Sequence, residues 1–213
     1  MSTLFLYYSK FNTNNLYMQS FLKEYNNFLT KEDCDFIIDF FESNSKYHYQ
    51  RSSLQQGYGI KDTSITLEVV RANKEISTFL SNLKEELSIK YREYLTGYVD
   101  YFFDEFPLMV NPIIHETKIQ RSLPGESYGK WHYERGYMYT PSPYDRLMAY
   151  TIYLNDIKKG GETEFIHQNY KIKPEMGKLS IFPAEFTHMH RGIPSMDETK
   201  YIITGWFEHR KSI

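Results

Sequence analysis

The N-terminal half of the sequence contains two segments in which apolar residues recur at the spacing of an amphipathic helix. In Asn27–Ser43 they fall at i, i+3, i+4 and i+7, at Cys34, Ile37, Ile38 and Phe41. Thr30 followed by Asp33 resembles the capping box that begins many helices. In Asn73–Tyr94 a second stripe consists of Ile76, Phe79, Leu80, Leu83, Leu87, Tyr91 and Tyr94. Both segments are therefore expected to be helices that bury one face, with Cys34 as a small core residue.

Beyond Pro112 the pattern changes to short runs of β-branched and aromatic residues, separated by clusters of Gly, Pro, Asn and Asp. Such runs are typical of strands joined by turns. They predict eight strands, at Ile113–Leu123, Lys130–Tyr139, Leu147–Leu154, Thr163–Ile166, Tyr170–Ile172, Lys178–Phe182, Thr187–Arg191 and Lys200–Glu208. Arg51–Ser64, with two glycines, and Gly136–Asp145, with two prolines, are expected to be long loops that could cover a site.

Two helices followed by eight strands favour the α+β class, with a double-stranded β-helix (jelly-roll) core and the N-terminal helices packed on one sheet. A chain of 213 residues fits one large β-rich domain better than two small ones. We expect residues 1–112 to form mainly helical support and a lid loop, and residues 113–213 to form the core that carries the chemistry.

Charge and cysteine content narrow the classes of function. The net charge is −2, from 25 basic and 27 acidic residues without a block of like charges, so nucleic-acid binding is not expected. The one cysteine excludes an intrachain disulfide, and a cytoplasmic location is the default expectation. Neither a signal peptide nor a membrane span is indicated by the apolar runs, which predicts a soluble protein that does not contact membranes.

A possible metal site begins with His132 and Glu134 on the predicted strand Lys130–Tyr139. Side chains two residues apart on a strand point to the same face, so these two could meet one ion. A surface pair is the more common explanation of this spacing, so the pair alone is a weak signal.

His188 and His190 strengthen this signal, because two histidines and one carboxylate form the facial triad of Fe(II) oxygenases. The triad leaves three adjacent coordination positions, two for a chelating 2-oxo acid and one for O₂. A structural zinc site needs four N or S donors, which one cysteine does not supply in the usual pattern. Catalytic zinc with two His and one Glu stays possible, although the helical His-Glu-x-x-His spacing is absent. Spacing alone does not choose between His188 and His190.

Lys200 opens the last predicted strand, ten residues after His190. A lysine that points into a barrel is costly without an anionic partner. A bound dicarboxylate would supply that partner.

Several spaced motifs occur together in the C-terminal half. They are Arg146–Asp156 followed by Gly160–Phe165, the run Pro174–Pro183 of the form P-x-x-G-x-x-x-x-F-P, and His190–Pro194 followed by Lys200 and Trp206. Across Ile119–Phe207 the sequence thereby resembles the prolyl 4-hydroxylase-like 2-oxoglutarate- and Fe(II)-dependent oxygenases.

The resemblance implies a role for each matching residue. His132, Glu134 and His190 would bind the iron, and Lys200 would bind the C5 carboxylate of 2-oxoglutarate. Further roles would fall to Tyr153 and Thr204 as hydrogen-bonding partners of that carboxylate, Trp206 as a wall of its pocket and Arg146 near the substrate entrance. His188 would then lie beside the site without binding the metal.

Two positions depart from the family pattern. Glu134 stands where the family usually has Asp, which puts the exact ligand geometry in doubt. Tyr128 precedes His132 by four residues instead of the usual three, so we assign it no contact with a ligand.

The resemblance implies an oxidoreductase, a dioxygenase that uses O₂ and converts 2-oxoglutarate to succinate and CO₂ while hydroxylating an unactivated C–H bond. Ascorbate would serve as reductant. A prolyl residue of a protein or peptide is the first expectation for the substrate. A lysyl, asparaginyl or other protein side chain, a free amino acid, another small molecule and a flipped nucleobase are alternatives. From a different class, a metal-binding sensor module without turnover is also open. We expect a monomer or homodimer.

Overall fold

The computed structural model describes residues 21–53, 59–70, 72–98, 111–135 and 144–210. The helices in these ranges are α1 (Lys31–Ser43) and α2 (Lys74–Tyr98), with short 3₁₀ turns at Ser45–Tyr47, Leu67–Val70 and Phe186–His188. The strands are β1 (Lys23–Tyr25), β2 (Tyr49–Ser53), β3 (Ile60–Thr66), β4 (Thr117–Ser122), β5 (Tyr144–Tyr153), β6 (Thr163–Phe165), β7 (Tyr170–Ile172), β8 (Leu179–Pro183), β9 (His190–Gly192) and β10 (Lys200–Arg210). None of the described helices is long and apolar enough to cross a membrane.

The first helix begins with the predicted capping box. Thr30 Oγ1 accepts a 3.1 Å hydrogen bond from the main-chain N–H of Asp33, and the Asp33 carboxylate accepts one of 3.2 Å from the N–H of Thr30. The helix therefore begins at Lys31, four residues later than its apolar pattern suggested. Cys34 is fully buried on the core face, and burial raises the pKa of its thiol to about 11, which suits a packing role.

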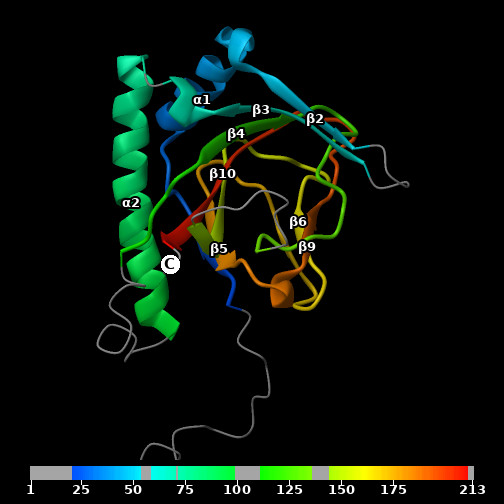
Figure 1. Cartoon of the computed structure of the whole chain (residues 1–213). Coiled ribbons are helices and arrows are strands. Elements are labelled where there is room, and N and C mark those ends of the chain that lie inside the picture. The colour runs from blue at the N-terminus through cyan, green and yellow to red at the C-terminus, as the bar shows by residue number, and fades with distance from the viewer. Residues whose placement is uncertain (1–20, 54–58, 71, 99–110, 136–143, 211–213) are drawn as a thin grey trace, which may run out of the picture.

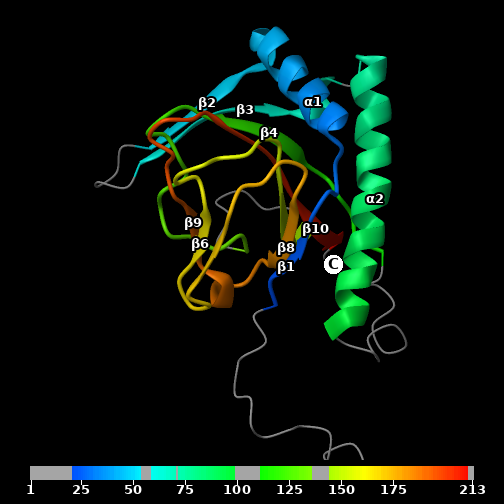
Figure 2. The same ribbon diagram turned by 180° about the vertical axis from the view of Figure 1, so that it is seen from behind.

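Two antiparallel sheets form the centre of the molecule (Figures 1 and 2). The larger sheet has the strand order β1-β8-β5-β10-β4-β3-β2, and the smaller has the order β7-β6-β9. In both views α1 and α2 lie on the far side of the larger sheet from β6 and β9. One hydrophobic cluster joins side chains of both helices to those of the larger sheet, and Tyr91 of α2 stacks on Phe207 of β10 with ring centroids 4.6 Å apart.

The predicted loop Arg51–Ser64 is wrong. Its described residues form β2 and β3, which pair from Tyr49 opposite Ser64 to Ser53 opposite Ile60. The run was not recognised as strand because its buried positions Asp62, Thr63 and Ser64 are polar. Together with β1, this hairpin means that the segment before residue 113 contributes three strands to the larger sheet as well as the helices.

The predicted strands at the histidines also need correction. Lys130–Tyr139 is not a strand in its described part, where His132 forms only an isolated bridge with His190 and Glu134 lies in a turn. Thr187–Arg191 divides into the 3₁₀ turn Phe186–His188 and the start of β9. The predicted loop Gly136–Asp145 falls on residues 136–143, outside the described ranges, and its last two residues belong to β5.

The remaining strand predictions are confirmed to within a few residues. Tyr170–Ile172 has the predicted bounds, and β10 extends the predicted Lys200–Glu208 by two residues. The runs Ile113–Leu123, Leu147–Leu154, Thr163–Ile166 and Lys178–Phe182 correspond to β4, β5, β6 and β8.

Candidate metal centre and active site

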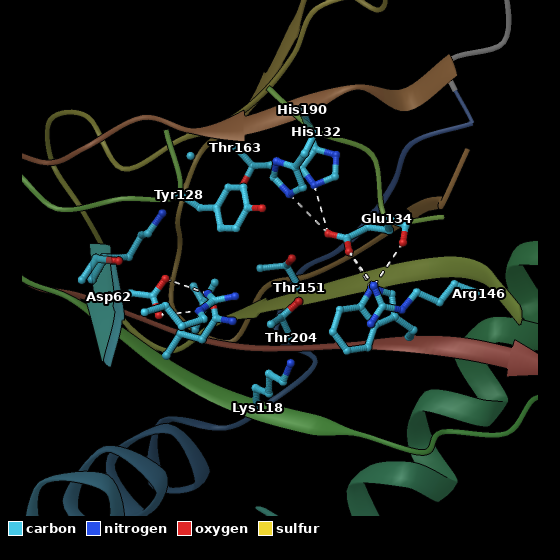
Figure 3. A pocket seen from close by; sticks show the side chains of 17 residues that line it. Asp62, Lys118, Tyr128, His132, Glu134, Arg146, Thr151, Thr163, His190 and Thr204 are labelled. Atoms are coloured by element: carbon cyan, nitrogen blue, oxygen red, sulfur yellow. Dashed lines mark hydrogen bonds and ion pairs between the residues drawn. The ribbon is translucent and has the colours of Figure 1, made fainter. Parts of the chain in front are cut away.

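Three side chains that are far apart in the sequence meet between the two sheets. The main chains of His132 and His190 exchange hydrogen bonds of 3.0 and 2.9 Å, which brings their rings to 4.3 Å between centroids. Glu134 Oε1 lies 3.5 Å from His132 Nε2 and 3.4 Å from His190 Nε2. One ligand atom from each of the three residues lies within 4.8 Å of the others, so the group could hold a metal ion (Figure 3).

Both imidazoles are oriented by the main chain. His132 Nδ1 lies 2.8 Å from the carbonyl oxygen of Lys130, and His190 Nδ1 lies 2.9 Å from that of His188. A carbonyl only accepts hydrogen bonds, so each Nδ1 carries a proton. Nε2 of both rings is thereby turned toward the Glu134 carboxylate, and it is the atom through which either ring could bind a metal.

The Glu134 carboxylate has partners on both sides. Its Oε2 accepts a 2.8 Å hydrogen bond from Trp206 Nε1 and lies 3.6 Å from Arg146 NH1. Burial would raise the pKa of Glu134, but hydrogen bonds and charge from His132 and His190 outweigh it and hold the pKa well below its usual value. The carboxylate is therefore ionised at neutral pH, as a metal ligand must be.

Of the two neighbouring histidines, His190 belongs to the group of possible ligands and His188 does not. His188 is buried in the 3₁₀ turn, and its Nδ1 lies 3.0 Å from Thr187 Oγ1. The 3₁₀ turn ends before His190, so the two rings do not share a face as they would on a continuous strand.

The three side chains open into a cavity of about 280 Å³ between the two sheets (Figure 3). Its floor is the larger sheet, with residues of β3, β4, β5 and β10, and its opposite wall includes Thr163 of β6 and His190 of β9. A cavity of this size fits a small metabolite and part of a substrate.

Lys200 reaches this cavity from the start of β10. It is 7% exposed, and its Nζ donates a 3.0 Å hydrogen bond to the carbonyl oxygen of Gly161. Among the described residues no carboxylate forms a hydrogen bond with Nζ, and Glu162 and Asp62 act on it only through their charge. Burial lowers the pKa of the Lys200 ammonium to about 8, although the charges of Glu162 and Asp62 oppose this shift. A buried cation of this kind favours an anionic ligand.

Comparison with known proteins agrees with this geometry. The model of the 2OG-Fe(II) oxygenase superfamily matches residues 117–208. "Probable prolyl 4-hydroxylase 9" of Arabidopsis thaliana is 27% identical over 84% of this chain and 66% of its own length, and "Probable prolyl 4-hydroxylase 3" of the same plant is 25% identical over 85% and 67%. These matches support a prolyl 4-hydroxylase-like 2OG-Fe(II) oxygenase. The chain spans just under two thirds of the length of the first of these relatives.

Solved structures of prolyl hydroxylases share the fold of this oxygenase. The viral collagen prolyl hydroxylase of Paramecium Bursaria Chlorella virus-1, in its 2OG complex, has a TM-score of 0.60 at 18% identity, over 92% of this chain and 100% of its own. The Trichoplax adhaerens prolyl hydroxylase, in complex with a hypoxia inducible factor peptide, has a TM-score of 0.62 at 17% identity, over 89% and 84%. These structures thus confirm the predicted β-rich jelly-roll core, while the predicted family rests on the sequence matches.

The other predicted site residues of the oxygenase lie at different distances from its cavity. Thr204, Trp206 and Arg146 line it, and Thr204 Oγ1 donates a 3.0 Å hydrogen bond to the main-chain oxygen of Tyr150. Tyr153 lies behind the cavity wall in a hydrophobic cluster. Its hydroxyl lies 2.7 Å from that of Thr163, which does line the cavity.

Sequence reasoning missed the side of the oxygenase cavity formed by β2, β3 and Tyr128. Arg51 donates to both oxygens of the buried Asp62, at 2.9 and 2.7 Å, and Ser64 donates to the same carboxylate at 3.0 Å. The Tyr128 ring lies 4.0 Å from the His132 ring and 5.5 Å from the Arg51 guanidinium. These residues could have been found only from knowledge of which strands pair, because Arg51–Ser64 shows no alternation of apolar and polar residues.

A second group that was missed did carry a signal. Lys118, Gln120 and Ser122 occupy alternate positions of β4 and all line the cavity. Alternate polar residues on a strand that is otherwise buried indicate a polar interior, which is what a site for a charged co-substrate needs.

Proposed function

We propose that this oxygenase hydroxylates an unactivated C–H bond of a prolyl residue in a protein or peptide, using Fe(II), 2-oxoglutarate and O₂. The observation that carries the proposal is the meeting of His132, Glu134 and His190 in one cavity with the buried ammonium of Lys200. The first three residues fit a metal, and Lys200 fits a dicarboxylate.

The donor set fits Fe(II). Two imidazole nitrogens and one carboxylate oxygen are the ligands of the facial triad, and three protein ligands leave positions for a co-substrate. The proposed ligands are therefore His132, Glu134 and His190, each with the partner that fixes its orientation. When bound, the iron and 2-oxoglutarate supply the oxidising power, with succinate and CO₂ as products.

Lys200 is proposed to bind the distal carboxylate of 2-oxoglutarate. In the absence of an anion its charge is satisfied by the carbonyl of Gly161 alone among the described residues. A carboxylate in the cavity would form a charge-assisted hydrogen bond with Nζ in surroundings of low dielectric constant, where such bonds are strong. Thr204 lines the same cavity, and its hydroxyl, which donates to the main-chain oxygen of Tyr150, would turn to donate to the carboxylate. Tyr153 would act through Thr163, whose hydroxyl it contacts.

The protein also has to keep water away from the reacting atoms. His190 is 6% exposed and Trp206 7%, and the ring of Tyr128 covers that of His132. This burial favours reaction with a bound substrate over unproductive consumption of the co-substrate.

The two N-terminal helices are proposed to support the larger sheet within a single domain over residues 1–213. Their apolar side chains belong to the same cluster as those of β5, β8 and β10. A rigid sheet matters here because Thr204 and Trp206 of β10 line the cavity from one face while Phe207 packs against α2 from the other.

A prolyl substrate is proposed because the relatives are named prolyl 4-hydroxylases and the solved neighbours include a collagen prolyl hydroxylase. The test is anaerobic loading with Fe(II), addition of 2-oxoglutarate, ascorbate, O₂ and proline-containing peptides, and mass spectrometry for a gain of one oxygen together with a succinate assay. His190→Ala should abolish both products, whereas His167→Ala, at an exposed histidine, should leave them unchanged. Oxygen gain on another residue or on a free amino acid would contradict the prolyl assignment. Metal binding without any succinate would contradict the enzymatic function.

A further inference from the structure

The two oxygens of the Glu134 carboxylate have different partners. Oε1 faces the Nε2 atoms of His132 and His190, at 3.5 and 3.4 Å. Oε2 accepts the 2.8 Å hydrogen bond from Trp206 Nε1. Figure 3 shows Glu134 between the labelled imidazoles on one side and Arg146 on the other.

The indole that holds Oε2 is itself held in place. The guanidinium of Arg146 lies 3.5 Å from the centroid of the Trp206 ring, and the same guanidinium donates a 3.1 Å hydrogen bond to the main-chain oxygen of Glu134. Arg146 therefore contacts the backbone of the proposed ligand and the ring that binds its side chain. Lys118 Nζ lies 4.9 Å from the same ring, and Trp206 is 7% exposed.

This arrangement matters because a carboxylate can bind a metal through one oxygen or through two. If both oxygens bind, the carboxylate occupies two coordination positions and leaves only two for co-substrate and O₂, instead of three. Glutamate has one more rotatable bond than aspartate, so its carboxylate needs a partner to remain in one orientation.

We propose that Trp206 is a positioning residue for the metal ligand. Its N–H donates a hydrogen bond to Oε2, so that Glu134 presents Oε1 alone to the metal. Arg146 holds the indole in the orientation that this hydrogen bond requires. The proposal rests on the proposed function, in which His132, Glu134 and His190 hold iron.

The chain allows a test that removes the N–H and little else. It has two tryptophans, and Trp131 lies under Arg191, with 4.5 Å between the guanidinium and the ring centroid. Trp131→Phe leaves Trp206 as the single tryptophan and serves as the matched control, because it also removes an indole that contacts an arginine. This variant is then expressed in cells that are supplied with β-(benzothien-3-yl)alanine in place of tryptophan. The analogue replaces the N–H of residue 206 with sulfur and has nearly the same shape as tryptophan.

The probe is Co(II), added without co-substrate to Trp131→Phe with tryptophan at position 206 and to the same variant with the analogue at that position. We expect equal thermal unfolding midpoints for the metal-free proteins. The protein without the N–H should show a Co(II) dissociation constant raised tenfold or more, as when a partner of a metal ligand is removed, together with a changed visible absorption of the bound Co(II). Equal affinity and equal spectra in the two proteins would overturn the proposal.

A second comparison separates an effect on the carboxylate from an effect on the fold. With Glu134→Asp in both proteins, the shorter side chain does not span the metal and the indole together. Loss of the N–H should then change the Co(II) dissociation constant less than twofold. A tenfold change in this background as well would show that the indole acts without the glutamate, and the proposal would be wrong. If Trp131→Phe binds neither Co(II) nor Fe(II), the proposed metal centre itself is contradicted.

Discussion

Lys200 Nζ donates a 3.0 Å hydrogen bond to the main-chain carbonyl of Gly161, and this carbonyl is its one hydrogen-bond partner among the described residues. The carbonyl satisfies a single donor of an ammonium that has three. The site is thus prepared for an anion, and in its absence the buried charge destabilises the protein.

Lys200→Met should raise the 2-oxoglutarate concentration required for half-maximal turnover by at least a hundredfold while metal affinity stays nearly constant. Removing one partner of a buried charge pair costs roughly 3–5 kcal/mol, and about 1.4 kcal/mol corresponds to a factor of ten. The measurement is succinate formation against 2-oxoglutarate concentration. Lys178→Met is the matched control, because Lys178 is also buried but pairs with Glu24 and Glu175 outside the cavity. An equal effect of both substitutions would contradict the role of Lys200.

The stability of the protein without 2-oxoglutarate should rise as the pH is raised from about 8 toward 10. Burial lowers the pKa of Lys200 from 10.5 to about 8, so in this window the unfolded chain binds more protons than the folded one. Chemical unfolding of the wild type and of Lys200→Met at several pH values would measure how the free energy of unfolding changes with pH. The wild type should gain stability relative to the variant across this window, and a constant difference would show that the ammonium is not desolvated.

His190→Ala should abolish binding of Fe(II), whereas His188→Ala should weaken it only slightly. His190 belongs to the group of three possible ligands, and His188 lies in the preceding 3₁₀ turn. Anaerobic titration with Fe(II) would measure both affinities, and thermal unfolding would show that each variant is folded. The opposite order of the two losses would mean that His188 is the ligand.

Asp62→Asn should lower the free energy of unfolding by about 1–3 kcal/mol. Asp62 is 4% exposed and accepts hydrogen bonds from Arg51 and Ser64, so the amide would leave the guanidinium without its counter-charge. The estimate lies below that for a fully buried pair because 28% of the Arg51 side chain is exposed. Asp35→Asn, in an exposed pair with Lys31, should leave the free energy of unfolding nearly unchanged. The measurement is urea unfolding of the three proteins.

The sequence predicted the elements in which the side-chain pattern and the surroundings agree. The core face of α1 and the alternation along β10 are examples, because apolar residues there meet other apolar residues. Where a strand that lines a polar cavity also carries few apolar residues on its other face, the pattern no longer distinguishes it from a loop. That is why β2 and β3, which carry Arg51 and Asp62, were missed.

The candidate site was predicted more completely than the strands that carry it. His132 and Glu134 were singled out by residue type and spacing, and His190 was preferred to His188 because of the resemblance to the family. Neither argument depends on whether His132 lies on a strand or in an isolated bridge. The hydrogen bond from Trp206 to Glu134 joins residues whose proximity arises only from the folded chain, so no local pattern could reveal it. The same holds for Tyr128 and its contact with His132.

Every second residue from the start of β10 faces the cavity, namely Lys200, Ile202, Thr204 and Trp206. The length of the strand thus fixes the separation between the ammonium of Lys200 at one end and the indole of Trp206 at the other. Insertion or deletion of one residue between them would turn either end toward the helices and exchange a polar interior for an apolar one. In an alignment of related chains, this stretch should therefore vary in residue type but not in length.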